Sequence, residues 1–394
     1  MRSVELFTGA GGLALGIARA GFQHLAVVER DPSACETLME NQNRNIEDMA
    51  TWRVFPIEVE KFDYSAIPEG VELLAGGVPC QPFSIGGKHR GHEDERNMFP
   101  ELVSAIQKLK PKAVLIENVR GLARPAFAKY FSYIELMLTY PEIKRKADDE
   151  WLSHLARLER YHTRGKRDGL YYRVVHRILN AADYGVPQKR ERLFMVAIRA
   201  DLGVEWSFPT PTHSHDALLW EQFCTGDYWE RHKVYRSKIA KLDQNQPNRV
   251  ENLRQRLLPP DHKPWLTVRD AISGLPKPTS KRTPEEPGLN HFFIPGAREY
   301  VGHSGSPLDE PAKTLKAGVH GVPGGENMVS LQDGTVRYFT IRESARLQTF
   351  PDDFVFPGSW SESMRQIGNA VPVKLSELIG RRLVSVLGFN GGAR

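Results

Sequence analysis

The first twenty residues combine three patterns that few folds accommodate together. Residues 4–7 are a short apolar strand, residues 8–12 have the sequence Thr-Gly-Ala-Gly-Gly, and apolar residues then recur at helical spacing up to Gly21. Glycine allows the sharp turn that joins a buried strand directly to a helix. This unit predicts a Rossmann-like α/β fold with a mostly parallel, doubly wound sheet, in which ligands bind beyond the carboxyl ends of the strands.

An acidic residue stands where such a fold would hold a ribose. A second apolar strand over residues 25–28 ends at Glu29, which lies 20 residues after Gly9. At that spacing a carboxylate can accept hydrogen bonds from ribose hydroxyls. Residues 9–14 also fit the glycine pattern of dinucleotide-binding proteins. We therefore predict a cofactor of the adenosine type, and a nicotinamide or flavin enzyme remains an alternative at this point.

A stiffened cysteine follows another buried strand. The run that starts at Leu73 ends in Gly76 and Gly77, and Cys80 then stands between two prolines, Pro79 and Pro82. Glycines permit a close approach of the backbone to a ligand, and prolines restrict the chain that follows. Cys80 is therefore a candidate nucleophile, although a small apolar residue in a turn would fit this local pattern equally well.

Charged residues flank two further apolar strands. Residues 113–116 are uninterruptedly apolar, as in a strand buried on both faces, and Glu117 follows them. If both strands belong to one parallel sheet, Glu117 and Cys80 lie at the same edge. Arg190 and Arg192 precede a third apolar strand, and their spacing of two residues predicts side chains on one face of it. A nucleophile, an acid and cations at one edge are the expected form of an active site.

Composition bounds the remaining possibilities. The chain has 394 residues, a net charge of +5 and three cysteines, so it has no disulfide framework and no metal-binding pattern. No apolar run approaches the length of a membrane span and no signal peptide is present, which together with the few cysteines favours a reducing compartment such as the cytoplasm. We expect a monomer. Over residues 205–335 the sequence is rich in proline and its helical patterns are short, which predicts a second domain there. The first domain would then comprise residues 1–204, completed by residues 336–394.

The motifs, taken in chain order, resemble those of the DNA (cytosine-5) methyltransferases. The resemblance rests on residues 7–12, 29, 77–81, 117–119, 188–192, 342–351 and 368–372. Each motif alone is weak, but the whole series in this order is specific and spans nearly the entire chain. It implies a methyltransferase domain and a smaller target-recognition domain over residues 205–335.

The resemblance implies S-adenosylmethionine as cofactor, and S-adenosylhomocysteine as product. Phe7 would pack against the adenine and Glu29 would hold the ribose. Glu58 stands where the family usually has Asp, and Asp63 is an alternative to it; Arg30 stands where an apolar or aromatic residue is common. The implied cofactor site comprises Phe7, Thr8, Gly9, Ala10, Gly11, Gly12, Glu29, Arg30, Glu58, Val59, Gly77, Pro79, Phe99, Asn369, Ala370 and Val371.

The implied chemistry is covalent catalysis on a cytosine that has left the DNA stack. The Cys80 thiolate would attack C6, Glu117 would stabilise N3 and read the exocyclic amine, and Arg192 would hold O2. Arg190 would steady the site or a phosphate. The glycine-rich, charged segment 86–96 would close over the DNA as a lid. The implied DNA contacts are Gln81, Ser84, Lys88, Arg96 and Thr314.

Three other functions remain to be weighed. A tRNA cytosine-5 methyltransferase of the same fold would lack a long recognition region, and the roughly 130 residues at 205–335 argue against it. A dehydrogenase would leave Cys80, Glu117 and Arg192 without a shared role. A DNA-binding regulator with an inactive site would not need both Cys80 and Glu117. The implied partner is duplex DNA, and a cognate restriction or phage-defence system is a further candidate partner.

Overall fold

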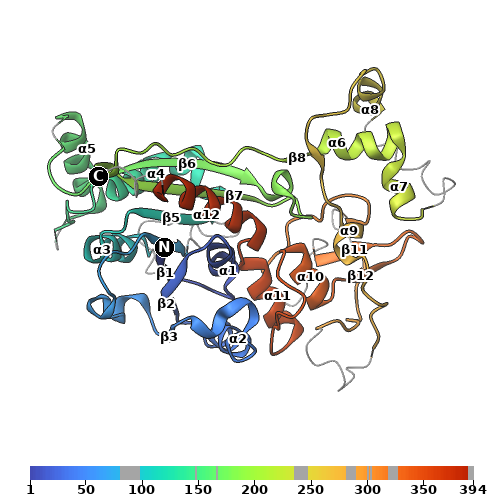
Figure 1. Ribbon diagram of the computed structural model, residues 1–394, viewed down its shortest axis with the longest axis horizontal. Helices are drawn as coiled ribbons and strands as arrows, with labels where there is room; N and C mark the ends of the chain where they lie inside the picture. Colours follow the sequence, from blue (N-terminus) through green and yellow to red (C-terminus); the bar gives the residue numbers. More distant parts are fainter. Residues whose placement is uncertain are drawn as a thin grey trace. The chain divides into compact units, whose positions relative to one another are not determined.

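The chain forms two compact units. The computed structural model describes residues 1–79, 98–146, 149–165, 167–234, 247–280, 290–299, 301, 304–317 and 327–388. Unit 1 comprises Met1–Leu179, Glu191–Pro209 and Ser376–Arg394, and unit 2 comprises Asn180–Arg190 and Thr210–Leu375. Each unit is therefore built from segments that are distant in the sequence (Figure 1).

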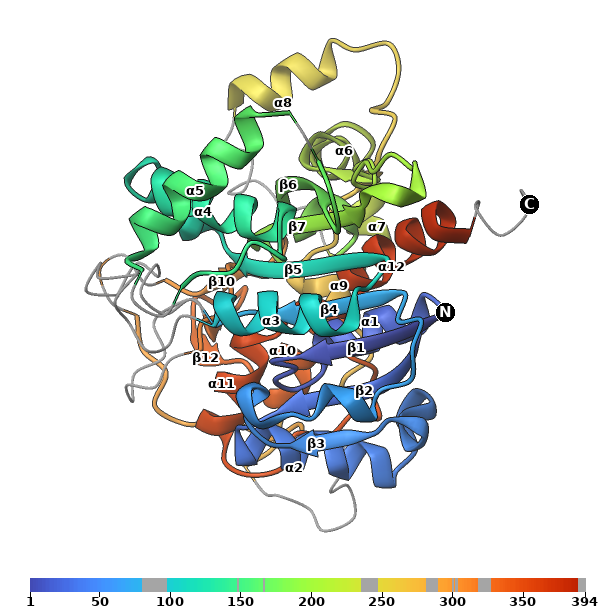
Figure 2. The same ribbon diagram turned by 90° about the vertical axis from the view of Figure 1, so that its left-hand side faces the viewer.

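Unit 1 contains a sheet to which the described residues contribute seven strands, in the order β3-β2-β1-β4-β5-β7-β6. The strands are β1 Arg2–Leu6, β2 Gln23–Glu29, β3 Val54–Pro56, β4 Leu73–Gly77, β5 Ala113–Val119, β6 Tyr172–Asn180 and β7 Glu191–Arg199. The pairs from β3 to β5 are parallel, and β7 is antiparallel to β5. Figure 2 shows the run from β3 to β5 in order. The mostly parallel, Rossmann-like sheet that the sequence predicts is confirmed.

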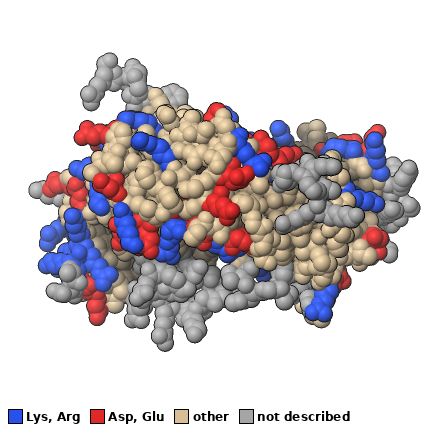
Figure 3. All heavy atoms as spheres, turned by 90° about the horizontal axis from the view of Figure 1, so that it is seen from below, with Lys and Arg blue, Asp and Glu red and all other residues tan. Residues whose placement is uncertain are grey.

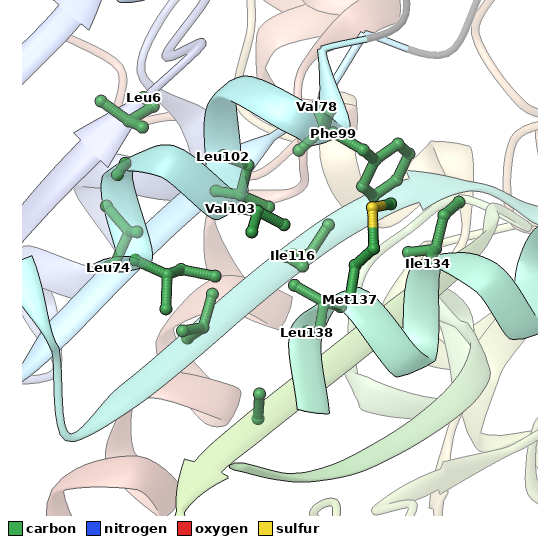
Figure 4. Close-up of a cluster of buried hydrophobic side chains, with 14 of the residues drawn as sticks. Leu6, Leu74, Val78, Phe99, Leu102, Val103, Ile116, Ile134, Met137 and Leu138 are labelled. Carbon is green, nitrogen blue, oxygen red and sulfur yellow. The ribbon is translucent and has the colours of Figure 1, made fainter. Parts of the chain in front are cut away.

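Alternation along the strands separates two faces of this sheet. Val4 and Leu6 of β1 and Val114 and Ile116 of β5 belong to the main hydrophobic core. Figure 4 shows side chains of this core between β5 and two helices, α3 Phe99–Leu109 and α4 Ala128–Thr139. Glu5, one residue off in register, lies on the other side, within reach of the backbone of Ala14. Its carboxyl is fully buried and neither oxygen has a hydrogen-bond partner among the described residues.

The remaining helices of unit 1 complete both faces. They are α1 Gly12–Arg19, α2 Pro32–Asn43, α5 Trp151–Thr163 and most of α12 Val373–Gly388. The C-terminal helix packs back on the first, because a Cβ placed on Gly380 would lie 2.7 Å from the Cβ of Ala20 and 3.1 Å from Cδ1 of Ile17. This contact joins the two ends of the chain within one unit.

Unit 2 consists of short elements. Its helices are α6 His215–Trp220, α7 Asp227–Arg231, α8 Pro247–Arg254, α9 Val268–Ile272, α10 Ile341–Leu347 and α11 Trp360–Asn369, and its strands are β8 His213–Ser214, β9 Lys263–Pro264, β10 Ser306–Pro307, β11 Met328–Ser330 and β12 Val336–Tyr338. Buried polar contacts stand beside buried apolar side chains such as Phe339, Phe354 and Phe356. Asp309 Oδ1 accepts from Arg269 Nε at 2.6 Å and from the buried Tyr228 hydroxyl at 2.9 Å.

The compact units and the expected domain boundaries differ in three segments, residues 180–190, 205–209 and 336–375. Residues 336–375 belong to unit 2 rather than to the sheet unit, and residues 180–190 join them there. The physical reason is a buried hydrogen-bond network around Arg190, described below. Among the described residues, no helix is long and apolar enough to cross a bilayer. The face seen in Figure 3 carries basic and acidic side chains interspersed, in keeping with the small net charge of +5.

Candidate active site

An ion pair lies at the carboxyl end of β5. Arg192 Nε lies 3.0 Å from Glu117 Oε1, and their side chains are only 15% and 10% exposed. The antiparallel pairing sets this distance, since Val119 is opposite Arg192 and Glu117 is opposite Phe194. Burial lowers the pKa of Arg192 from its ordinary value, while the charge and hydrogen bond of Glu117 act in the opposite direction. Sequence spacing alone places these two groups at one sheet edge, and the structure brings them into contact.

Two glycines end β4 beside this pair, for different reasons. A Cβ on Gly76 would lie 2.8 Å from the carbonyl oxygen of Leu6, so the packing of β4 against β1 excludes any larger residue there. Gly77 pairs with Glu117, and its Cβ would lie 3.6 Å from Glu117 Oε2, an ordinary contact. The packing against β1 therefore requires a glycine at position 76, whereas Gly77 leaves space beside the carboxylate of Glu117.

Asn118 connects β5 to the segment that follows β4, a role that our sequence analysis did not assign. The side chain is 2% exposed. Its Nδ2 donates to the carbonyl of Val78 at 3.2 Å, and its Oδ1 accepts from the amide of Val119 at 2.8 Å. Val78 and Pro79 lead directly to Cys80. The signal in the sequence was a second polar residue immediately after Glu117.

Several predicted residues lie outside the described part of the chain. They are Cys80, Gln81, Ser84, Lys88 and Arg96, together with the expected lid at 86–96. Their proposed roles remain predictions.

The glycine turn is held by Glu29. Its Oε2 accepts from the amide of Gly9 at 2.6 Å, and its Oε1 accepts from the amides of Arg30 and Asp31 at 2.8 Å each. Phe7 has a φ of 56°, which is rare for a bulky residue and indicates local strain at the end of β1. The carboxylate of Glu29 therefore ties the glycine turn to the end of β2.

The other residues of this turn are arranged compactly. The Thr8 hydroxyl donates to the carbonyl of Val28 at 3.2 Å, and Ala10 is buried. Gly11 has a φ of 87°, and a Cβ on it would lie 2.9 Å from Leu38 Cδ2. Gly12 begins α1. By contrast, a Cβ on Gly9 would meet no atom within 4 Å, so the space next to Gly9 is open.

A hollow of about 510 Å³ lies next to the end of β2. It is lined by Arg30, Asp31, Pro32, Pro56, Ile57, Glu58 and Lys61. Glu58 Oε2 lies 2.7 Å from Lys61 Nζ, and this contact lowers the pKa of Glu58. Asp63 instead caps a short 3₁₀ helix, accepting from Ser65 N at 3.0 Å and from Ser65 Oγ at 2.7 Å. Of the two candidate acids, Glu58 is the one that lines the hollow.

Two residues expected near the cofactor belong to the core. Val59 is 5% exposed and Phe99 is 1% exposed, and both are members of the main core cluster. Figure 4 shows the ring of Phe99 beside the sulfur of Met137 and close to Val78. A cofactor contact by these side chains stays a prediction.

Unit 2 holds the other predicted residues. The Arg190 guanidinium is fully buried and donates to the carbonyls of Leu315, Gly368 and Ala370. Asn369 is exposed between those last two residues, and Val371 is 5% exposed. The Thr314 hydroxyl donates to the carbonyl of Lys189 at 2.7 Å. Arg190 lies one residue before β7, which begins at Glu191. The alternation of side chains along a strand therefore does not fix its direction, and its partners differ from those of Arg192.

Comparison with known proteins identifies the family. The family model for C-5 cytosine-specific DNA methylase matches residues 1–139 and 165–385. The chain belongs to this family. It is therefore an enzyme, a DNA (cytosine-5-)-methyltransferase. The family model leaves out residues 140–164, which include the helix α5.

Relatives and solved structures agree with this assignment. The methyltransferase is 33% identical over 388 residues to the Type II methyltransferase M.Eco47II of Escherichia coli, covering 98% of this chain and 79% of the relative. It is 30% identical to M.NgoMIV of Neisseria gonorrhoeae, covering 98% and 97%. The Dnmt2 methyltransferase structure of S. pombe superposes with a TM-score of 0.54 at 18% identity, covering 99% and 100% of the two chains, which shows the fold.

Proposed function

We propose that this methyltransferase transfers a methyl group from S-adenosylmethionine to C5 of a cytosine flipped out of a specific duplex DNA sequence, through a covalent bond between Cys80 and C6. The observation that carries the proposal is the buried pair of Glu117 and Arg192, 3.0 Å apart at the strand edge toward which the Cys80 segment leads. A carboxyl and a guanidinium at this separation can engage N3, the exocyclic amine and O2 of one pyrimidine.

Exchange of partners within the pair gives it a catalytic role. While Arg192 contacts Glu117, the carboxylate is stabilised in its ionised form, which cannot donate to N3. A cytosine that offers O2 to Arg192 draws the guanidinium from the carboxylate. Glu117 then takes up a proton from solvent and shares it with N3, where negative charge builds when C6 is attacked. Recognition of the base and activation of the base thus depend on the same exchange.

Cys80 provides the nucleophile in this proposal. Its thiolate would form the Sγ–C6 bond as the C5–C6 double bond opens, which makes C5 electron-rich enough to take a methyl group. A base would then remove the C5 proton, and the electron pair of that bond would restore the double bond and expel the Cys80 thiolate. Asn118 bonds the carbonyl of Val78, two residues before Cys80 in the sequence, and we propose that it supports the nucleophile from there. The target carbon is inaccessible in a stacked duplex, so the base must leave the helix.

The residues of unit 1 fit an adenosyl cofactor. The hollow of about 510 Å³ offers apolar walls for an adenine, and Glu58 offers a carboxylate to its amino group. Glu29 and the amide-rich turn around Gly9 stand next to the first strand end, where Gly9 borders open space. Asn369, Ala370 and Val371 of unit 2 are the further proposed contacts. S-adenosylmethionine, when bound, supplies the methyl group.

We further propose that the chain acts as a monomer on the DNA of a bacterial cell, as the modifying partner of a restriction or other defence system. Two relatives are named as Type II methyltransferases, which supports this context. Bisulfite sequencing of DNA from cells that express the gene would give the methylated sequence.

A transfer assay tests the proposal directly. The purified enzyme is incubated with S-adenosylmethionine labelled in its methyl group and, in parallel, with unmethylated plasmid DNA or bulk tRNA. We expect label in DNA, loss of transfer in Cys80→Ser, and retained binding of S-adenosylhomocysteine by that variant. A duplex with 5-fluorocytosine at the target should form a complex stable to denaturing gels with the parent enzyme only. Label in tRNA alone, or parent-level transfer by Cys80→Ser, would refute the proposal.

A further inference from the structure

The Arg190 guanidinium is buried among backbone carbonyls of two separate segments of unit 2. It is 0% exposed. Its Nη2 donates to the carbonyls of Gly368 at 2.7 Å and Ala370 at 2.8 Å, and its Nη1 donates to that of Leu315 at 3.2 Å. Gly368 and Ala370 flank the end of α11, where unpaired carbonyls and the helix dipole favour a cation. The fork of arginine thus joins a helix end to an extended segment.

Two buried glutamines divide this junction into sides. Gln348 Nε2 donates to the carbonyls of Ile367 at 2.7 Å and Ala370 at 3.1 Å, so it supports the helix end. Gln188 Oε1 accepts from the amide of Leu315 at 2.9 Å, so it supports the extended segment. Gln188 Nε2 also donates to the carbonyl of Leu347 at 3.2 Å and to Gln348 Oε1 at 3.3 Å, which links the two sides. Both glutamines are 0% exposed.

The two segments also touch backbone to backbone. A Cβ on Gly368 would lie 2.4 Å from the amide nitrogen of Ala317 and 2.6 Å from the carbonyl carbon of Lys316. Next to this contact Asn369 is exposed, and Thr314 is tied to the carbonyl of Lys189. Arg190 is a buried side chain that bonds both segments.

We infer that Arg190 is a positioning residue that holds the 369–371 turn and the segment of Thr314 and Leu315 as one body, and that it does not contact the substrate. The inference rests on the proposed function for the ligands of these elements: the cofactor for the turn and DNA for Thr314. It follows that Arg190 supports the binding of both ligands. Gln348 supports chiefly the cofactor, and Gln188 supports chiefly the DNA.

Four variants test this division. Arg190→Lys keeps the charge but loses the fork, while Gln348→Met and Gln188→Met keep the side-chain volume without the hydrogen bonds. Arg342→Lys is the matched control, because Arg342 is also 0% exposed and donates to backbone carbonyls, those of Pro351 at 3.0 Å and Phe354 at 2.7 Å. Each protein is measured by calorimetric titration with S-adenosylhomocysteine and by thermal melting. KM and kcat are measured on an unmethylated duplex that carries the target sequence of the enzyme.

The expected pattern is a split between the two ligands. Arg190→Lys should weaken S-adenosylhomocysteine binding and raise the KM for DNA, each about tenfold, corresponding to about 1.4 kcal/mol. Gln348→Met should shift chiefly the first quantity and Gln188→Met chiefly the second, with a smaller effect on the other because the two glutamines are hydrogen-bonded to each other. Arg342→Lys should lower the melting temperature, because buried hydrogen bonds are lost. The affinity for S-adenosylhomocysteine and the KM for DNA should each stay within about twofold of the parent values.

The outcomes separate the inference from the proposed function. If Arg190→Lys changes only the melting temperature, as Arg342→Lys does, the positioning role is refuted. If Arg190→Lys does not fold, the two glutamine variants decide, because equal effects of both on both ligands would also refute it. If the parent enzyme neither binds S-adenosylhomocysteine nor methylates DNA, the proposed function fails instead.

Discussion

Exchange of Asn118 for Asp would test whether the hydrogen bond to Val78 controls the chemistry. The Oδ1 acceptor for the amide of Val119 is preserved, but the Nδ2 donor becomes an oxygen that faces the carbonyl of Val78 at about the present 3.2 Å. A buried carbonyl deprived of its donor costs roughly 1 to 3 kcal/mol, to which repulsion between the two oxygens adds. The segment should move to relieve this cost, and Cys80 is two residues away.

At 1.4 kcal/mol per factor of ten, this loss corresponds to a fall in kcat of roughly 5-fold to 150-fold. The KM for S-adenosylmethionine should change less than kcat, since Gly77 and Pro79, which flank Val78, are only two of the proposed cofactor contacts. Methyl transfer to DNA under single-turnover conditions measures the effect on chemistry without product release.

A matched control is Asn41→Asp. Asn41 is 0% exposed and its Nδ2 donates to the carbonyl of Thr37 at 2.7 Å, within the helix α2. The same chemical change there should reduce stability and leave kcat near the parent value. Equal kcat for Asn118→Asp and Asn41→Asp would refute the argument that the Asn118 bond positions the nucleophile.

Three further predictions concern stability. Gly76→Ala should lower the melting temperature by about 2 to 10 °C, because its Cβ would meet the Leu6 carbonyl at 2.8 Å. Gly77→Ala should change the melting temperature little, and equal shifts of the two variants in scanning fluorimetry would contradict this. Burial lowers the pKa of His24 to about 4, so the fold should lose roughly 3 kcal/mol as the pH falls from about 6.5 to 4, and urea titrations should show this slope disappear in His24→Gln. Burial raises the pKa of Glu5, so ionisation opposes folding as the pH rises, and Glu5→Gln should stabilise the enzyme more at pH 8 than at pH 4.5; a uniform gain would refute this explanation.

Much of unit 1 could be predicted because its signals are local. Uninterrupted apolar runs identified β4, β5 and β7, and glycines identified the first turn. The end of β1 was less certain: the apolar pattern includes Phe7, but the strand stops at Leu6 and Phe7 adopts a left-handed backbone conformation. Such strain depends on the surrounding packing and leaves no periodic signal.

The partners of individual side chains were harder to predict. The spacing of Arg190 and Arg192 suggested a shared face, but β7 begins at Glu191, and the acceptors of Arg190 are carbonyls more than a hundred residues away in the sequence. Carbonyl acceptors have no residue signature, because every residue has one. For the same reason the assignment of residues 336–375 to unit 2 was not visible in the sequence.

The antiparallel pairing of β5 with β7 has a consequence for how such an enzyme can change its target. Glu117 and Arg192 belong to the same unit, and a ladder of backbone hydrogen bonds sets their separation. Residues 210–375 can therefore vary in length and composition without altering the distance between the acid and the guanidinium. Exchange of the part of that segment that precedes Leu315 between related enzymes is then a means of changing sequence specificity, while the acid, the guanidinium and the 369–371 turn bonded by Arg190 are inherited intact.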